Sequence, residues 1–437
     1  MLLIRILGVP NDNQWCMSID ELQNDGRITA AGILDAVINL KQLVFEVTDA
    51  CNLRCRYCAY GDLYFGYDNR EARHLSFDKS KALLDYLSKT WREHIPSSLT
   101  PHTFISFYGG EPLLNITLVK QIVQYIQRMD INRSFSFSMT TNGMLLDRYM
   151  DYLAENKFHV LVSLDGDEAG NGYRVTPSGG SSFGRVFKNV KLLQEKYPDY
   201  FEEFVNFNAV LHSLNSVEKT CDFIKKEFNK VPTISELNSS NIKEDKVAEF
   251  NQMFRSKSQS LSESTDKESL AERLFLSNPD TNELALFIHQ YSGNVYRDYN
   301  DLLCNPAKTH RCPTGTCLPF SKKMFVTVNG KILPCEKISQ EYVLGTVGPE
   351  GVQLDYEQIA ATHNNYLDKM QKQCSACFGK KGCMQCFYYV NGIEKNNPSC
   401  QGFMNKTQFQ EYVHRNLIYL KNHPDMYDTI LNEVNVD

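Results

Sequence analysis

The sequence lacks a basic excess, a long apolar run and the cysteine density of a small secreted protein. Its 46 lysines and arginines are fewer than its 52 acidic residues, and the acidic excess is spread along the chain. This charge balance indicates no surface for nucleic acid or for an anionic membrane. No run approaches the roughly 18 apolar residues of a membrane span, and the apolar amino-terminal stretch ends at Pro10, too early for a secretory signal. We therefore expect a cytoplasmic protein without nucleic-acid or membrane partners.

Cysteine is scarce for a disulfide-stabilised scaffold but frequent for an intracellular enzyme. The chain has 14 cysteines in 437 residues, about 3%, against roughly 8–10% in small secreted scaffolds. Cytoplasmic thiols stay reduced, so clustered cysteines there favour metal binding over disulfides. The spacing of the cysteines is therefore the feature that needs an explanation.

Short β-branched and aromatic runs alternate with helical patterns from residue 43 onward. This alternation predicts βαβ units in a parallel sheet, with strands at 43–48, 103–107, 134–139, 159–164, 204–211 and 233–237. In parallel sheets and barrels the chemistry gathers in the loops after the carboxyl ends of the strands. Unusual loops follow the first four predicted strands: they contain Cys51, the YGGEP segment 108–112, the TTNG segment 140–143 and Asp165 with Gly166. We expect these four loops to lie together.

Three cysteines follow the first predicted strand in a C-x3-C-x2-C motif: Cys51, Cys55 and Cys58. Thiolates at this spacing can converge on one soft metal centre. Three ligands on a four-iron cluster leave one iron open to a ligand from outside the protein. The alternative is three of the four ligands of a structural zinc, but no fourth cysteine or histidine follows before His74.

This motif, with Tyr57 before the third cysteine, resembles the signature of the radical S-adenosylmethionine (radical SAM) superfamily, and residues 109–112 resemble its GGEP loop. The resemblance implies that Cys51, Cys55 and Cys58 hold a 4Fe-4S cluster whose open iron binds SAM. Reduction of the cluster would then cleave SAM to a 5′-deoxyadenosyl radical. The resemblance also implies that SAM contacts Tyr57, Gly109, Gly110, Glu111, Asn142, Ser163, Asp165 and Arg174. For Arg174, an ordinary surface position or a salt bridge to a nearby acid is the alternative.

Eight more cysteines lie between residues 312 and 400. They form C-x4-C, then C-x12-G-x4-C, then C-x2-C-x5-C-x2-C and a last cysteine. This pattern resembles the SPASM extension of radical SAM enzymes, although the final C-x2-C is one residue shorter than the usual C-x3-C. The resemblance implies two auxiliary 4Fe-4S clusters, the first held by Cys312, Cys317, Cys335 and Cys386, the second by Cys374, Cys377, Cys383 and Cys400. Two alternatives stay open: Cys304 replaces Cys312, or a zinc ribbon forms from Cys374, Cys377, Cys383 and Cys386. Cys16 and Cys221 are expected to be structural.

The predicted fold class is α/β: a partial (β/α)6 TIM-like radical SAM barrel, followed by a small cysteine-rich SPASM domain with a β-hairpin and helices. The hairpin is predicted at residues 324–333, with Asn329 and Gly330 supplying the two positive φ angles of a type I′ turn. The expected segments are an amino-terminal cap (1–42), the barrel (43–237), a helical insertion or linker (238–300), the SPASM domain (301–403) and a carboxy-terminal helix (404–437).

The resemblance implies an enzyme that matures ribosomally made peptides. It implies three 4Fe-4S clusters and SAM as cofactors, a precursor peptide as substrate, and a reductant such as flavodoxin or ferredoxin. The expected product is a thioether or carbon–carbon cross-link. Alternatives are formylglycine formation in a sulfatase and, without enzymatic activity, a zinc-ribbon binding scaffold. Glu336, directly after Cys335, is a candidate catalytic base or a solvated residue after a hairpin, and the polar stretch 238–267 is a candidate leader-binding element.

Overall fold

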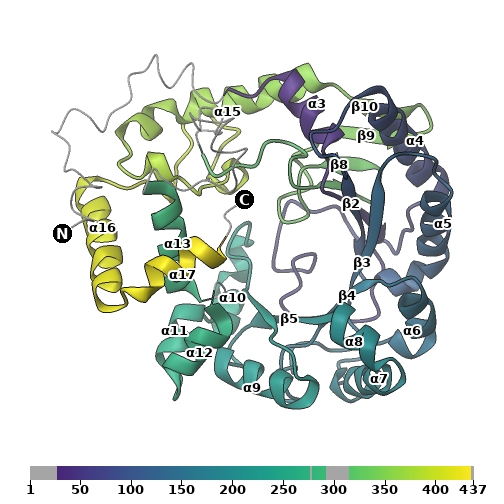
Figure 1. The fold of residues 1–437 in the computed structure, drawn as a ribbon, viewed down its shortest axis with the longest axis horizontal. Helices are drawn as coiled ribbons and strands as arrows, with labels where there is room; N and C mark the ends of the chain where they lie inside the picture. Colours follow the sequence, from purple (N-terminus) through teal and green to yellow (C-terminus); the bar gives the residue numbers. More distant parts are fainter. Residues whose placement is uncertain (1–26, 276–277, 292–313, 435–437) are drawn as a thin grey trace. The chain divides into compact units, whose positions relative to one another are not determined.

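The computed structural model describes residues 27–275, 278–291 and 314–434 (Figure 1). The chain divides into two compact units. The barrel unit consists of Ile33–Leu274 and Pro319–Asp355, and the helical unit of Met1–Gly32, Phe275–Leu318 and Tyr356–Asp437. Cys16, Cys304, Cys312 and most of the predicted amino-terminal cap lie outside the described residues. The described end of that cap forms helix α3 (Ala30–Ile38).

Six parallel strands form the barrel sheet and confirm the predicted fold class. They pair in sequence order: β1 (Gln42–Thr48), β2 (His102–Gly109), β3 (Ser134–Thr141), β4 (His159–Ser163), β5 (Val205–Leu211) and β6 (Thr233–Glu236). Each begins and ends within two residues of its prediction, because β-branched and aromatic residues dominate these segments and favour strands.

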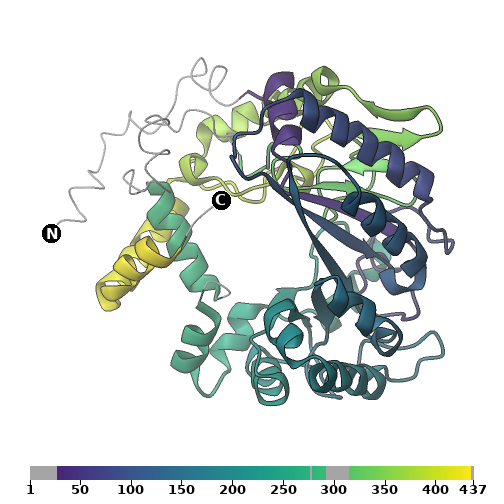
Figure 2. The same ribbon diagram turned by 45° about the vertical axis from the view of Figure 1, so that its right-hand side comes forward.

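Helices cover the outer face of this sheet (Figures 1 and 2). They are α4 (Phe77–Glu93), η1 (Pro112–Asn115), α5 (Ile116–Gln127), α6 (Leu146–Glu155), α7 (Phe183–Lys196), α8 (Pro198–Phe204) and α9 (Val217–Phe228). Side chains alternate along the strands: Ile105 and Phe107 are buried towards the helices, whereas Ser106, between them, faces the barrel interior with Ser138 of the next strand. The inner wall of the barrel is therefore partly polar.

The predicted helical insertion begins as part of the barrel. It contains η2 (Glu244–Lys246), α10 (Val247–Met253), α11 (Lys257–Ser262) and α12 (Lys267–Leu274). Leu270 and Leu274 of α12 are buried in a hydrophobic cluster that contains residues of β5, β6 and α9, among them Cys221. Cys221 is 3% exposed and has the structural position expected for it. Within 238–267, Phe250 and Met253 of α10 are buried in a cluster with Leu63 and Tyr64, so this stretch is packed against the barrel rather than freestanding.

The predicted hairpin joins the barrel sheet. Strand β7 (Met324–Val326) pairs in parallel with β1, and β8 (Lys331–Leu333), β9 (Gly345–Gly348) and β10 (Gly351–Leu354) follow as antiparallel strands. The predicted type I′ turn is wrong, because of the two turn residues only Gly330 has a positive φ, at 84°. Gly330 N–H donates to the Thr327 carbonyl at 2.8 Å, which fits a three-residue hairpin loop with glycine in the left-handed position.

The helical unit has a core of its own. Its helices are α13 (Pro279–Tyr291), α15 (Tyr356–Ala376), α16 (Lys406–Asn422) and α17 (Asp425–Glu433), with short turns η4 (Lys380–Gly382) and η5 (Phe387–Tyr389). Leu284, Phe287, Phe409, Leu420 and Ile430 form a buried cluster. The single helix predicted over 404–437 is two helices, because Pro424 disfavours helical backbone at His423.

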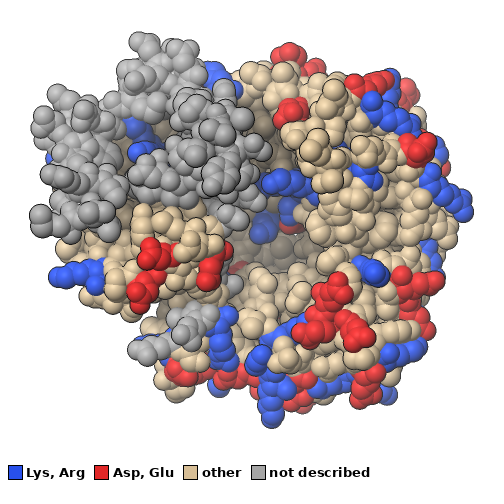
Figure 3. Space-filling view, viewed as in Figure 1, with Lys and Arg blue, Asp and Glu red and all other residues tan. Residues whose placement is uncertain are grey.

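None of the described helices is long and apolar enough to cross a membrane. Acidic and basic side chains are interspersed over the described part of the face shown in Figure 3.

Candidate functional site

The three cysteines of the C-x3-C-x2-C motif lie in one loop that starts directly after β1. Arg54 N–H donates to the Val175 carbonyl at 2.7 Å and Arg56 N–H to the Tyr173 carbonyl at 3.0 Å, so the loop backbone is fixed on one side. Leu53 N–H donates to Cys51 Sγ at 3.4 Å, and Cys58 N–H to the Cys55 carbonyl at 3.1 Å. Burial raises the pKa of the Cys55 thiol to about 12, and the nearby Arg174 opposes this rise.

Gly109 and Gly110 bring the loop after β2 against the entry of the cysteine loop. Gly110 N–H donates to the Thr48 carbonyl and Glu111 N–H to the Ala50 carbonyl, both at 2.9 Å. A Cβ on Gly109, whose φ is 138°, would lie 2.1 Å from the Thr48 oxygen, and one on Gly110 would lie 2.1 Å from the Ala50 oxygen. Glycine is required at both positions because any side chain would separate the two loops.

Glu111 connects the loops after β2 and β3. Its carboxylate is fully buried and accepts hydrogen bonds from Thr141 Oγ1 at 2.7 Å, Asn142 N at 2.7 Å and Leu113 N at 3.1 Å. Burial raises the Glu111 pKa to about 7, although these hydrogen bonds lower it. Asn142 in turn donates to Asn52 Oδ1 at 2.7 Å and lies 3.8 Å from Cys51 Sγ. The Glu111 side chain therefore holds the site together.

Asp165 is the centre of a second buried network. Arg174 binds its two carboxylate oxygens at 2.9 and 3.0 Å, and the Val210 N–H donates to it at 2.8 Å. The Tyr57 hydroxyl also donates to this carboxylate, and His212 Nε2 lies 3.5 Å from it. Burial works against ionisation of Asp165, but Arg174 and these donors hold its pKa below the usual range. The salt bridge considered for Arg174 is thus present, and it fixes the aromatic residue of the cysteine motif.

Two residues that were not expected in the site, His212 and Glu46, support the loop. His212, which stacks on Tyr57 with ring centroids 5.4 Å apart, follows β5 directly, and this position could have indicated its place in the site. Glu46, within β1, binds Arg70 Nη2 at 3.0 Å and accepts from Val328 N at 3.1 Å. Ser163, assigned to SAM binding, is buried at the end of β4.

Comparison with known proteins identifies the domain that carries these loops. Residues 45–225 match the family model described as the radical SAM superfamily. The chain contains a radical SAM domain. Its parallel strands and the loops after β1 to β5 lie within or beside the matched region.

Curated relatives and solved structures agree with this domain. The chain is 28% identical over 194 residues to the cysteine-type anaerobic sulfatase-maturating enzyme of Clostridium novyi (strain NT), covering 43% of this chain and 49% of the relative. It is 26% identical over 178 residues to the radical SAM cyclopropyl synthase TigE of Paramaledivibacter caminithermalis, covering 39% of this chain and 35% of the relative. The chain thus spans about half or less of the length of these relatives. The structure described as native anSMEcpe with bound AdoMet aligns with a TM-score of 0.59 at 18% identity, over 90% of this chain and all of that one, which shows a shared fold.

A radical SAM domain implies a 4Fe-4S cluster and SAM, and the residues present fit both. Three thiols come from one loop, and none of the described cysteines forms a disulfide. The glycine pair leaves the loop after β2 without side chains where it meets the cysteine loop. Cys51, Cys55 and Cys58 would hold the cluster, beside the Gly109–Gly110 segment and Asn142.

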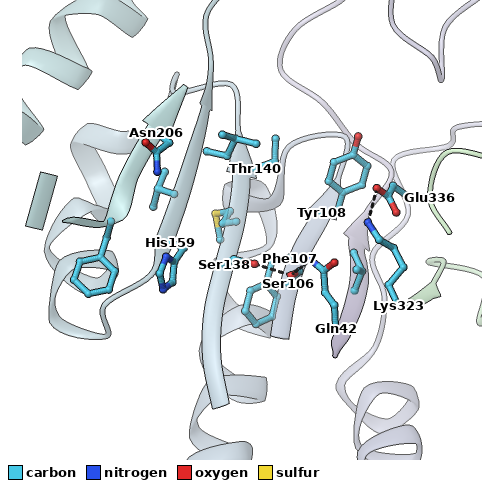
Figure 4. A pocket seen from close by; sticks show the side chains of 15 residues that line it. Gln42, Ser106, Phe107, Tyr108, Ser138, Thr140, His159, Asn206, Lys323 and Glu336 are labelled. Atoms are coloured by element: carbon cyan, nitrogen blue, oxygen red, sulfur yellow. Dashed lines mark hydrogen bonds and ion pairs between the residues drawn. The ribbon is translucent and has the colours of Figure 1, made fainter. Parts of the chain in front are cut away.

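The interior of the radical SAM barrel contains a pocket of about 270 Å³ (Figure 4). Its polar wall includes a hydrogen-bonded row across three strands, from Gln42 Nε2 to Ser106 Oγ at 2.7 Å and from Ser106 to Ser138 at 2.6 Å. At the end near Tyr108, Lys323 Nζ lies 2.9 Å from Glu336 Oε1. Glu336 is therefore in the pocket wall, paired with a cation, and its other oxygen lies 3.7 Å from Cys335 Sγ.

The cysteines of the proposed second auxiliary set gather within the helical unit. Burial raises the pKa of Cys374 to about 12, and the neighbouring thiols of Cys383, Cys400 and Cys377 raise it further. Cys377 N–H donates to the Cys374 carbonyl at 3.2 Å. In the first set, Cys335 belongs to the barrel unit, Cys317 and Cys386 belong to the helical unit, and Cys312 lies outside the described residues. That set remains a prediction.

The zinc-ribbon alternative requires four ligands around one point, with sulfur about 2.3 Å from the metal. Among the described residues, no group of three or more histidine, cysteine, aspartate or glutamate side chains is arranged to hold a metal ion, and this applies to both groups of cysteines. The zinc ribbon stays an alternative for Cys374, Cys377, Cys383 and Cys386.

Proposed function

We propose that the protein is a radical SAM maturase that oxidises a residue of a polypeptide substrate. The observation that carries this proposal is the junction of the C-x3-C-x2-C loop with the Gly109–Gly110 segment at the carboxyl edge of the parallel barrel. This edge is where parallel barrels place their chemistry. When bound, the cluster and SAM together supply the one-electron chemistry that removes a hydrogen atom from an unactivated C–H bond.

The chain's own residues hold and enclose this chemistry. Glu111 and Asp165 fix the loops after β2, β3 and β4, so that the ligand loop is ordered before any substrate arrives. The pocket inside the barrel is lined by hydroxyl and amide groups together with apolar side chains such as Val44, Met139 and Leu161, and this mixture suits a segment of a peptide.

Cross-link formation removes two hydrogens from the substrate. One leaves as a hydrogen atom, and the second leaves as a proton and an electron. We assign the proton to Glu336, whose carboxylate faces the pocket beside Lys323. We assign the electron to auxiliary clusters held by the eight later cysteines, with flavodoxin or ferredoxin as the external reductant.

Glu336→Gln tests the proton assignment. Product formation should fall about 100-fold or more, since general base catalysis contributes typically 10²–10⁴-fold, while SAM cleavage continues. The matched control is Glu341→Gln, at an exposed carboxylate close in sequence. Equal product formation by both variants would exclude Glu336 as the base.

Two products are considered. The first is a thioether or carbon–carbon cross-link in a short ribosomal peptide. The second is formylglycine in a sulfatase, which is supported by the similarity to anaerobic sulfatase-maturating enzymes.

Anaerobic reconstitution followed by incubation with peptide, SAM and reductant tests the proposal. Three clusters predict roughly twelve irons per chain. A cross-linked peptide loses two hydrogens and does not react with a hydrazine reagent. A serine-derived formylglycine also loses two hydrogens but does react, and a cysteine-derived one loses two hydrogens, exchanges sulfur for oxygen and reacts as well. A colourless protein with one or two zinc ions and no SAM cleavage would contradict the proposed function.

A further inference from the structure

Tyr64 is buried beside the cysteine loop, yet its hydroxyl has no hydrogen-bond partner among the residues that the structure describes. The side chain is 4% exposed. It belongs to a hydrophobic cluster, against which Cys55 packs, with Tyr57, Leu63, Leu237, Phe250 and Met253. A buried hydroxyl without a partner is destabilising, so its presence points to an acceptor that the polypeptide does not supply.

Two successive backbone turns connect the third cysteine to Tyr64. Gly61 N–H donates to the Cys58 carbonyl at 2.8 Å, and Tyr64 N–H donates to the Gly61 carbonyl at 3.4 Å. A Cβ on Gly61 would lie 3.0 Å from the Cys58 oxygen, which shows how tightly the chain folds at this point.

The other side of this turn is held by the segment before α10. Phe65 N–H donates to the Asn241 carbonyl and Lys243 N–H to the Leu63 carbonyl, both at 2.9 Å. The Tyr64 backbone is therefore held by hydrogen bonds from two directions.

The buried hydroxyl shares the hydrophobic cluster against which Cys55 packs. A phenol O–H group is a hydrogen-bond donor as well as an acceptor, so it can serve an acceptor bound beside this cluster.

Resting on the proposed function, in which Cys51, Cys55 and Cys58 hold an iron–sulfur cluster, we propose that the Tyr64 hydroxyl donates a hydrogen bond to a sulfur atom of that cluster. Hydrogen bonds to cluster sulfurs raise the reduction potential, because they stabilise the added electron. Tyr64 then acts as a positioning residue that sets the potential of the cluster without contacting the substrate.

Tyr64→Phe removes the hydroxyl alone, and Tyr152→Phe is the matched control. The Tyr152 hydroxyl is likewise buried and unpaired within the described ranges, but it lies on α6, with its ring 5.9 Å from Phe158 and 4.9 Å from Lys120 Nζ. Both variants are made in the full chain. Each is compared with the original protein before and after reconstitution.

The first measurement is anaerobic redox titration of the cluster that binds SAM. With Tyr64→Phe we expect a lower potential, equivalent to about a tenfold lower ratio of reduced to oxidised cluster at a fixed applied potential, or about 59 mV for one electron. Tyr152→Phe should titrate like the original protein. After exchange into heavy water, electron spin resonance should detect coupling between the deuterium of the Tyr64 hydroxyl and the reduced cluster. This coupling should be lost in Tyr64→Phe and kept in Tyr152→Phe.

The second measurement is thermal unfolding without the cluster. Both variants should then be as stable as the original protein or more stable, because each removes an unpaired buried hydroxyl. After reconstitution only Tyr64→Phe should lose part of the stabilisation that the cluster provides. Unchanged potential and stability in a reconstituted Tyr64→Phe protein would overturn this proposal and leave the proposed function intact. Failure of the original protein to take up any cluster would overturn both.

Discussion

The two groups of cysteines are held by different kinds of structure. Cys51, Cys55 and Cys58 lie on one loop at the end of a central strand, supported by a glycine contact and two buried carboxylate networks. The later cysteines come from a helix end, short turns and the segment after β8, and they are divided between the two units. The comparison indicates that the first three cysteines belong to a hydrogen-bonded part of the barrel, whereas the proposed auxiliary sites would require several segments to reach their positions together.

The largest difference between the two groups should appear on loss of one cysteine from each. Cys55→Ala should abolish SAM cleavage, because it removes one of only three ligands. Cys374→Ala should retain SAM cleavage while losing about four of the roughly twelve irons and most of the peptide product. Iron analysis and separate assays of methionine and peptide product check this. SAM cleavage by Cys55→Ala would show that Cys55 is not a required ligand of the first site.

Glycine contacts in the two regions provide a second test. A Cβ on Gly110 would lie 2.1 Å from the Ala50 oxygen, and one on Gly315 would lie 2.2 Å from the Met384 carbonyl carbon. Gly110→Ala should destabilise the barrel by about 3 kcal/mol, because both backbones are held by the sheet. Gly315→Ala should leave SAM cleavage unchanged and disturb the helical unit.

The control for both glycines is Gly184→Ala, at a position in α7 where a Cβ meets no atom within 4 Å. It should stabilise the protein by about 0.5–1 kcal/mol, since alanine is the better helix former. Thermal unfolding of the three variants measures the differences. If Gly110→Ala behaves like Gly184→Ala, the close approach of the two loops is not needed for stability.

The buried carboxylates of the first site should make its stability depend on pH in a defined direction. Glu111 has a pKa of about 7 in the folded protein and 4.5 as its ordinary value. The folded state therefore binds this proton more tightly, and stability should fall by about 3 kcal/mol as the pH rises from 4.5 to above 7. Glu111→Gln should remove this decline. Denaturant unfolding at several pH values checks it, and an identical pH profile in both proteins would contradict the assignment.

The smallest effect is expected at a cysteine outside both groups. Cys221 is buried in α9 against Leu270 and Leu274 of α12. Cys221→Ala should cost about 1 kcal/mol of stability through lost packing, with iron content and SAM cleavage unchanged. A loss of iron in this variant would show that the division of the cysteines is incomplete.

Several features were correctly predicted from the sequence because they depend on local pattern. The six strands follow from runs of β-branched and aromatic residues, and the position of the cysteine motif after β1 follows from the order of the chain. The hairpin at 324–333 was also predicted, but its turn type was not. Thr327 N–H donates to the Lys331 carbonyl, and the Val347 carbonyl oxygen lies where a Cβ on Gly330 would be. These tertiary contacts decide which turn residue needs a positive φ. The break before α17 depends on Pro424, which disfavours helical backbone at the residue before it.

The amino-acid sequence alone predicted the class of site, a soft metal centre. Three thiols at fixed spacing in one loop can bind a single metal centre wherever that loop lies in the fold. Only the tertiary structure decided what the surrounding polar residues do. Glu111 is bonded to Thr141 and Asn142 after β3, and Asp165 to Tyr57 in the cysteine loop and to Val210 in β5. These partners are 30 to 108 residues apart in the chain and meet only after the parallel strands align. Burial then makes these pairings obligatory, because an unpaired charge inside the barrel would be too costly to retain.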